Sequence, residues 1–214
     1  MGELVDLPGD GPTAGYLATG EGAGPGVLVL DHRGPADHVA DVCERLAAEG
    51  FTALAPALPH DGTLPPDLVP VADRLSGAVD HLQAHPAVRG QGIGVIGFSV
   101  GAGVALCLAS IRPDRVRAVV PFYGTVPWDS PQPDWSAMTA SVEGHYAEHD
   151  DLAGPEGRAK LEQLLVDLGL DVRMFLYPAT APGFFDDTSA GRYDEDAARQ
   201  AWVRTLEFLR AKLG

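Results

Sequence analysis

Short apolar runs alternate with helix-like stretches along nearly all of this 214-residue chain, and this alternation restricts the fold more than any other feature. The apolar runs resemble strands buried on both faces and cover residues 26–31, 51–57, 92–98, 116–122, 172–177 and, more weakly, 140–146. Helical spacing of apolar side chains marks residues 36–49, 68–85, 99–108, 152–168 and 195–212. Because parallel strands need crossover connections, usually helices, the pattern predicts an α/β fold with a mostly parallel sheet covered on both faces.

The length of the chain and the alternation along most of it predict a single domain over residues 1–214. Residues 2–7 and 13–19 read as an antiparallel hairpin at one edge of the sheet. Gly50 is placed to end the first helix in the left-handed conformation. In sheets of this kind ligands bind beyond the carboxyl ends of the strands. Functional residues are therefore expected just after Leu30, Ala57, Phe98, Phe122, Tyr146 and Tyr177.

The charge of the chain argues against polyanionic partners. The net charge is −15, and lysine occurs only at Lys160 and Lys212, whereas a nucleic-acid binder would present a basic patch. We therefore expect a small-molecule substrate and neither nucleic acid nor an anionic membrane as partner. No apolar run reaches the length of a membrane span and no signal peptide is visible, which predicts a cytoplasmic protein. The sequence leaves open whether it is a monomer or a homodimer. Cys43 and Cys107 lie in helical stretches and are expected to be buried free thiols.

The segment Gly97-Phe98-Ser99-Val100-Gly101 carries the strongest chemical signal. It matches G-x-S-x-G, follows an apolar strand and opens a helix, as in a nucleophile elbow. A sharp turn there lifts the serine oxygen out of the sheet, and the flanking glycines keep Cβ atoms away from neighbouring backbone. The Val100 amide then points toward a reacting carbonyl oxygen at a helix N-terminus that favours negative charge. A tight turn with Ser99 as helix cap is the alternative.

Taken together, several segments resemble the dienelactone hydrolase family of the α/β-hydrolase superfamily over nearly the whole chain. They are PGVLVLDHRG at 25–34, RLAAEGFTALAPAL at 45–58, IGVIGFSVGAG at 93–103, VVPFYGT at 119–125, GHYAEHDDLAGPE at 144–156, FLYPATAPGFFD at 175–186 and YDEDAARQAWVRTLEFL at 193–209. The resemblance implies an α/β-hydrolase fold with activity on a small ester or lactone. It places the nucleophile at Ser99, where the family usually has cysteine, and the triad acid at Asp150. It also places an acid near the nucleophile at Asp31 and an oxyanion-hole amide at His32, beside that of Val100.

The family's catalytic histidine has no counterpart. Its position, in a segment resembling YPGAGHAF, is Pro182 in YPATAPGF. The histidines of the chain are His32, His38, His60, His81, His85, His145 and His149, and none follows Asp150. A serine hydroxyl is a weak nucleophile without an adjacent base, so the ordinary triad mechanism is not available.

Two histidines are candidates to replace the missing base. His32 could face Ser99, oriented by Asp31 or Asp150, or it could be a solvent-facing loop residue. His60 also follows a strand and is expected to line the pocket. Asp31 and Asp150 could instead be turn residues. His145 is expected in the core, and His149, His38, His81 and His85 at the surface.

Other side chains are expected around the site. Tyr123, Trp128 and Phe184, with Trp135 and Phe185, are candidates for its aromatic walls, and the loop from Trp128 to Trp135 is long enough to form a lid. Arg33 could bind a substrate carboxylate or be a solvated charge. Asp186 and Asp187 read as exposed acids. The sequence shows no metal motif and no phosphate loop, so no metal and no cofactor are expected.

Three functions remain open from the sequence. The first is hydrolysis of a small ester or lactone by Ser99 with a relocated base. The second is a non-hydrolytic cyclase, isomerase or lyase that uses the oxyanion hole to stabilise an enolate. The third is a catalytically inactive homologue that binds a ligand. The intact elbow argues against the third function, and the absent histidine argues against the first.

Overall fold

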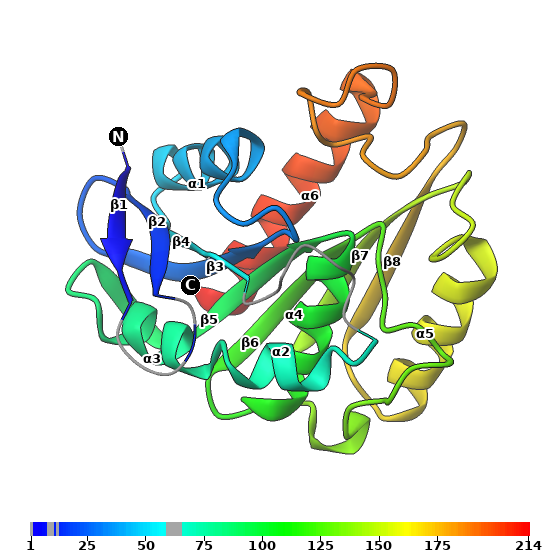
Figure 1. Ribbon diagram of the computed structural model, residues 1–214, viewed down its shortest axis with the longest axis horizontal. Helices are drawn as coiled ribbons and strands as arrows, with labels where there is room; N and C mark the ends of the chain where they lie inside the picture. Colours follow the sequence, from blue (N-terminus) through cyan, green and yellow to red (C-terminus); the bar gives the residue numbers. More distant parts are fainter. Residues whose placement is uncertain (1, 8–10, 12, 59–65) are drawn as a thin grey trace.

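A computed structural model describes residues 2–7, 11, 13–58 and 66–214 and contains one eight-stranded sheet (Figure 1). The strands are β1 (Glu3–Asp6), β2 (Ala14–Thr19), β3 (Gly24–Leu30), β4 (Thr52–Pro56), β5 (Val88–Phe98), β6 (Val116–Phe122), β7 (Ser141–Ala147) and β8 (Val172–Tyr177). Their order is β1-β2-β4-β3-β5-β6-β7-β8. Strands β1 and β2 pair antiparallel, as does β2 with β4, and the remaining pairs are parallel. The predicted α/β class and the edge hairpin are confirmed.

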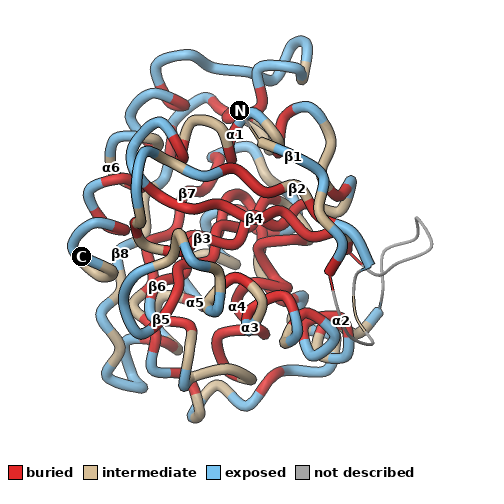
Figure 2. The backbone as a smooth tube through the Cα atoms, turned by 90° about the vertical axis from the view of Figure 1, so that its left-hand side faces the viewer, coloured by how far each residue is buried: buried red, intermediate tan, exposed pale blue. Residues whose placement is uncertain are grey.

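Helices cover both faces of this sheet (Figure 1). They are α1 (Asp37–Ala48), α2 (Val69–Asp73), α3 (Ser76–Ala84), α4 (Val100–Ile111), α5 (Pro155–Asp167) and α6 (Glu195–Leu213), with a short 3₁₀ turn, η1 (Trp135–Ala137). Helices α1 and α6 pack with one set of buried side chains, and α2 to α5 pack with another. Figure 2 shows the central strands as buried along most of their length. The sheet is therefore apolar on both sides, as its unbroken apolar runs require.

The expected helices differ from the structure by one to three residues at their ends, and one of them is divided. The stretch 68–85 forms two helices, because the Leu75 amide bonds to the Ala72 carbonyl three residues back, which tightens the turn between α2 and α3. Helix α5 begins at Pro155 and not at residue 152, since the Asp150 carboxylate accepts the amides of Leu152 and Ala153 in a preceding turn. Strand β5 starts at Val88, four residues before the expected position.

Several smaller predictions are confirmed. Cys43 and Cys107 are buried free thiols. Gly50 has φ +87° directly after α1. His145 is fully buried, with its ring nitrogens 2.9 Å from the Tyr177 hydroxyl and 3.1 Å from Thr205 Oγ1. Burial lowers the pKa of His145 to about 3, so the ring is neutral at physiological pH. Among the described helices, none has both the length and the apolar character of a membrane span.

The connection from β5 to α4 sets the position of Ser99. Ser99 has φ 53° and ψ −118°, a combination that residues with a Cβ rarely adopt. Its amide bonds to the Phe122 carbonyl at 3.0 Å, which fixes the turn against β6. Glycine allows the close contacts around this turn: a Cβ at Gly97 would meet the carbonyl of Gly101, and one at Gly101 would meet the carbonyl of Leu30. The helix can therefore start directly above the sheet.

We predict that Gly101→Ala lowers the free energy of unfolding by about 2–4 kcal/mol, because its methyl group would meet rigid backbone and not a movable side chain. Gly157→Ala is the matched control on helix α5, where the nearest atom to the new Cβ is the Leu152 carbonyl oxygen at 3.5 Å. That change should be neutral or stabilising by up to about 1 kcal/mol. Urea unfolding followed by circular dichroism measures both. Equal stability of Gly101→Ala and the wild type would show that helix α4 can move away from the sheet.

Candidate active site

The carboxyl ends of neighbouring strands bring the candidate residues together. Strands β3, β5 and β6 are adjacent in the sheet, and Asp31, Ser99 and Tyr123 directly follow them. Asp150 follows β7, and Pro182 lies in the loop after β8. Ser99 lines two cavities, one of about 430 Å³ and one of about 170 Å³. Tyr123 and Pro182 also line both, so these three residues form the junction between the cavities.

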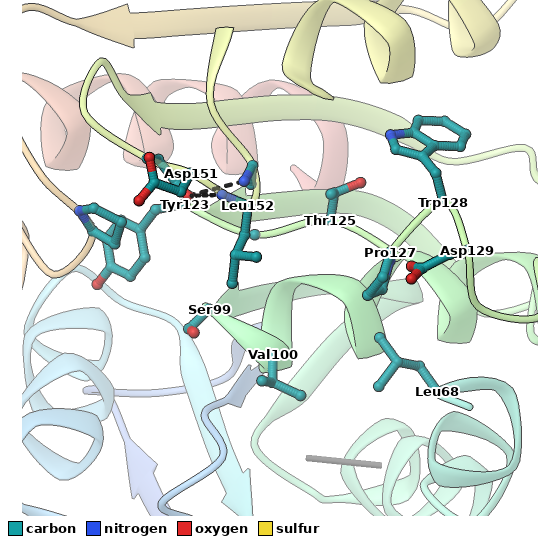
Figure 3. Close-up of a pocket in the computed structure, with 14 residues that line it drawn as sticks. Leu68, Ser99, Val100, Tyr123, Thr125, Pro127, Trp128, Asp129, Asp151 and Leu152 are labelled. Carbon is teal, nitrogen blue, oxygen red and sulfur yellow. Dashed lines mark hydrogen bonds between the residues drawn. The ribbon is translucent and has the colours of Figure 1, made fainter. Parts of the chain in front are cut away.

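The larger cavity is mostly apolar (Figure 3). Its lining residues are Leu68, Ser99, Val100, Tyr123, Gly124, Thr125, Pro127, Trp128, Asp129, Asp150, Asp151, Leu152, Ala153 and Pro182. In Figure 3, Ser99 and Val100 mark the strand-to-helix turn, with Tyr123 and Trp128 at opposite ends of the view. The cavity therefore places the predicted nucleophile, the predicted oxyanion amide and the family's acid and base positions around one space.

Asp150 and Pro182, the residues that the sequence resemblance assigns to the family's acid and base positions, both line the larger cavity. One carboxylate oxygen of Asp150 accepts the amides of Leu152 at 2.8 Å and Ala153 at 2.9 Å. The other, Oδ2, is buried and makes no hydrogen bond with the described residues. The carboxylate is thus a turn-forming group with capacity for a further donor. The pyrrolidine ring of Pro182 has no donor to offer.

The smaller cavity is charged, and its lining includes Asp31, His32, Arg33, Asp186 and Arg192. Asp31 is 3% exposed and accepts the backbone amide of Arg33 at 2.8 Å and the Arg33 guanidinium at 3.2 Å. Nδ1 of His32 lies 3.2 Å from the same carboxylate. Arg33 also donates to Asp186 at 2.9 Å, a contact between residues 153 positions apart in the chain. The guanidinium thus joins two buried carboxylates beside Ser99, and its bond to Asp31 raises the pKa of Arg33.

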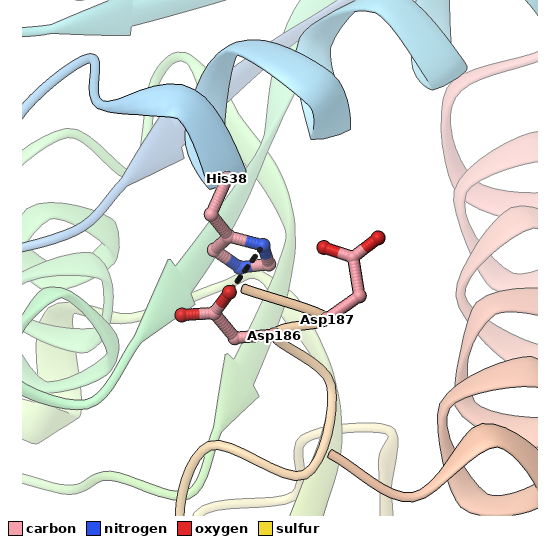
Figure 4. Close-up of side chains that lie close together, drawn as sticks. All are labelled: His38, Asp186 and Asp187. Atoms are coloured by element: carbon pink, nitrogen blue, oxygen red, sulfur yellow. Dashed lines mark ion pairs between the residues drawn. The ribbon is translucent and has the colours of Figure 1, made fainter. Parts of the chain in front are cut away.

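Asp186 corrects one expectation, because it is 4% exposed and not a surface acid. Burial alone raises the pKa of Asp186, but hydrogen bonds from Thr188 and Arg33 outweigh it and lower the pKa overall. His38 was also expected at the surface and is 3% exposed, with Nδ1 3.5 Å from Asp186 (Figure 4). Burial lowers the pKa of His38 and favours its neutral form. Asp186 is therefore buried with two partners, Arg33 and His38, and His38 is buried beside Asp186.

His38, Asp186 and Asp187 offer ligand atoms within 4.8 Å of one another (Figure 4). A divalent cation would have to displace contacts already present. One oxygen of Asp186 accepts two hydrogen bonds from Thr188, and the other accepts Arg33. With a guanidinium already neutralising the buried carboxylate, the group fits an ion-paired network better than a metal site.

Tyr123 has an unusual backbone as well as a central position. Its φ is +36°, and Ser99 and Tyr123 are two of the three described non-glycine residues with positive φ. The ring is buried between Phe98, Phe122 and Phe184, with centroids 5.5–6.1 Å away. Burial, and then the charges of Asp31 and Asp186, raise the pKa of Tyr123 well above its usual value. The hydroxyl therefore stays protonated and can donate a hydrogen bond into the site.

The other predicted lining residues divide into two groups. Trp128 lines the larger cavity, and Lys160 Nζ lies 4.0 Å over its ring. Phe184 does not form the wall as expected, because it is fully buried behind Tyr123 in the core. Trp135 packs against the core in η1 and lines neither cavity. His60 lies outside the described residues, and His149 is exposed.

Most wall residues of the larger cavity could not be predicted from the sequence. Leu68, Leu152 and the pair Thr125 and Pro127 come from three separate connections, and nothing in their local patterns distinguishes them. Asp186 had a signal, since it directly follows Phe184 and Phe185, and an acid beside buried aromatic residues requires a buried partner. That partner, Arg33, could not be identified from spacing.

Known proteins of similar sequence and structure identify the family of the chain. Protein usf of Aquifex pyrophilus is 28% identical over 232 aligned positions that cover all of both chains. A protein of Aquifex aeolicus named "Putative carboxymethylenebutenolidase" is 26% identical, again over all of both chains. A dienelactone hydrolase-like promiscuous phosphotriesterase, P91, from metagenomic libraries superposes with a TM-score of 0.84 at 23% identity, covering 100% of this chain and 99% of the other. The sequence matches the dienelactone hydrolase family over residues 13–67 and 61–213, so the chain belongs to that family.

Proposed function

We propose that this chain hydrolyses a small ester or lactone with Ser99 as nucleophile. The observation that carries the proposal is the backbone of Ser99, with φ 53° and ψ −118°, at the junction of two cavities. Such a conformation is costly and is usually kept where it serves a site. The name of the Aquifex aeolicus relative, a carboxymethylenebutenolidase, supports a lactone among the substrates. We also propose that residues 1–214 act as one cytoplasmic domain without a cofactor.

We propose His32 as the base that replaces the missing histidine. It lines the smaller cavity with Ser99, and Nδ1 of its ring lies 3.2 Å from the Asp31 carboxylate, close enough for that charge to stabilise the imidazolium that forms when the ring takes a proton. In this mechanism Nε2 of His32 takes the Ser99 proton while Oγ attacks the substrate carbonyl carbon. The same proton passes to the leaving alkoxide when the carbon–oxygen bond breaks. Water then attacks the acyl carbon while His32 takes its proton, and His32 returns this proton to Ser99 Oγ as the acyl–oxygen bond breaks and the carboxylic acid leaves.

The developing oxyanion needs donors that do not move during the reaction. The Val100 amide belongs to the first turn of α4, whose amides have no acceptor within the helix. The dipole of the same helix favours negative charge at this end. We propose the backbone amide of His32 as the second donor and the protonated hydroxyl of Tyr123 as a substrate contact.

Pro182 favours a second candidate, a non-hydrolytic enzyme on the same fold. Without a base beside Asp150, the oxyanion hole could stabilise an enolate while His32 moves a proton. A cyclase, isomerase or lyase of this kind would need the amides around Ser99 but not its hydroxyl. The serine and histidine variants below separate this candidate from the hydrolase, and also from a protein that only binds its ligand.

One prediction of the proposed function concerns Pro182→His. We expect weak hydrolysis of p-nitrophenyl acetate by the natural chain, because the family's base position carries proline and His32 has to act from the smaller cavity alone. An imidazole at position 182 would lie on the cavity that Ser99 and Asp150 share, so kcat/KM should rise at least about tenfold. Pro182→Ala is the control for loss of the proline ring, and Pro182→His with Ser99→Ala should lose the gain. A folded Pro182→His variant without the gain would contradict a triad-like arrangement of Ser99 and Asp150.

The second prediction concerns Ser99 and His32 acting together. If the chain is a hydrolase, Ser99→Ala and His32→Ala should each remove activity toward the best ester found, and the double variant should be no worse than either. If it is a proton-transfer enzyme, His32→Ala should be severe, whereas Ser99→Ala should keep substantial activity. His149→Ala, at an exposed histidine outside both cavities, is the control. Full activity of His32→Ala would remove His32 from both mechanisms.

A further inference from the structure

The two cavities that meet at Ser99 differ sharply in chemical character. The larger has walls of leucine, valine, proline and tryptophan side chains, from Leu68, Val100, Pro127, Trp128 and Leu152. The smaller is lined mainly by charged and polar groups. A substrate bound across Ser99 would place chemically different parts on the two sides. The larger cavity, at about 430 Å³, lies in the range of roughly 300–1,000 Å³ that small-molecule sites occupy.

The charges of the larger cavity all have one sign. Three carboxylates, those of Asp129, Asp150 and Asp151, line it, and none of its described lining residues is lysine, arginine or histidine. Asp129 and Asp151 are exposed at the mouth of the cavity. Apolar walls focus such a field because they are poorly polarisable. A negative group entering this cavity would meet like charges.

The cations around Ser99 and Trp128 contact other groups and do not line this cavity. Lys160 lines the adjoining groove, where its ammonium lies over the Trp128 ring and not inside the cavity. Arg33 is held by Asp31 and Asp186 on the other side of Ser99. Arg192 lines the smaller cavity only. A carboxylate in the larger cavity would therefore lose water without gaining a cationic partner, which is unfavourable.

We propose that the substrate part that enters the larger cavity is an apolar group without negative charge, either neutral or bearing an ammonium group. Apolar walls stabilise its hydrocarbon, and the carboxylates of Asp129 and Asp151 suit a cation at the cavity mouth. The inference rests on the proposed function for the placement of the reacting bond at Ser99. It goes further in excluding anionic groups from one side of that bond.

Binding of three matched probes tests the inference without turnover. Phenylpropylammonium, phenylpropanol and phenylpropionate share one aromatic body and differ in charge at one end. Isothermal titration of the full chain at low salt should give the ammonium and the alcohol at least about tenfold lower Kd than the carboxylate. Equal affinity for the carboxylate and the ammonium would overturn the proposal. So would the absence of millimolar binding by all three, because the cavity would then not be an apolar site.

Variants assign the selectivity to this cavity. Asp129→Asn with Asp151→Asn should reduce the ammonium-to-carboxylate preference at least about threefold, as should added salt. Leu152→Arg, at a wall residue that is 88% exposed, should improve carboxylate binding. Asp187→Asn is the control, since that exposed acid lines neither cavity. An unchanged preference in both cavity variants would show that the probes bind elsewhere and would overturn the assignment.

The same probes distinguish this inference from the function of Ser99. The binding preference should persist in Ser99→Ala, which keeps the cavity walls. If Ser99→Ala retained esterase activity while the preference persisted, the proposed function would fail and the cavity's selectivity would stand. If ester turnover required Ser99 but butyrate and hemisuccinate p-nitrophenyl esters reacted equally well, the proposed function would stand and the selectivity would fail.

Discussion

The close approach of helix α4 to the sheet is the constraint on which the rest of the site depends. The first turn of α4 lies against the carboxyl end of β3, where a Cβ at Gly101 would meet the Leu30 carbonyl. A Cβ at Gly124, on the loop after β6, would likewise meet the carbonyl of Ser99. Backbone from three strands and one helix therefore converges without side chains between. This contact holds Ser99 where two cavities meet and points helix amides at the same place.

The two cavities that meet at Ser99 differ in character: the smaller is charged and the larger is mostly apolar. Arg33 holds Asp31 and Asp186 together, although the two acids come from opposite ends of the sequence. The two carboxylates are buried and the guanidinium is partly exposed, so the loss of Arg33 would leave two buried charges without their cation, which is unfavourable. The network therefore fixes the loop after β3, and with it His32, relative to the loop that carries Pro182. On the far side of Ser99 no comparable network exists among the described residues that line the larger cavity.

The sequence predicted the fold well because its apolar runs are repeated and unambiguous. Strands β6 and β8 have the bounds that their runs indicated, and the elbow follows from glycines at fixed spacing. The break between α2 and α3 was not predictable, since a buried leucine at position 75 fits one continuous helix as well as two short ones.

The candidate site was predictable only in part. Residues that directly follow strands, such as Asp31 and Ser99, could be placed from topology. The burial of Asp186 and His38 could not be predicted in this way. Asp186 pairs with Arg33, which is far from it in the sequence, and His38 lies beside Asp186. Phe184 shows the reverse error. Its sequence position predicts that it lines the substrate cavity, whereas it packs behind Tyr123 in the core.

The left-handed backbone of Ser99 also bears on how this chain would respond to selection. Glycine adopts such a conformation without steric cost, whereas a residue with a Cβ holds it at a cost of about 1–3 kcal/mol. Stability and chemistry therefore favour different residues at one position. A variant library sorted only for resistance to heat should enrich glycine at position 99, and one sorted for turnover should retain serine. The elbow is thus a site where thermal robustness and reactivity are opposed within a single residue.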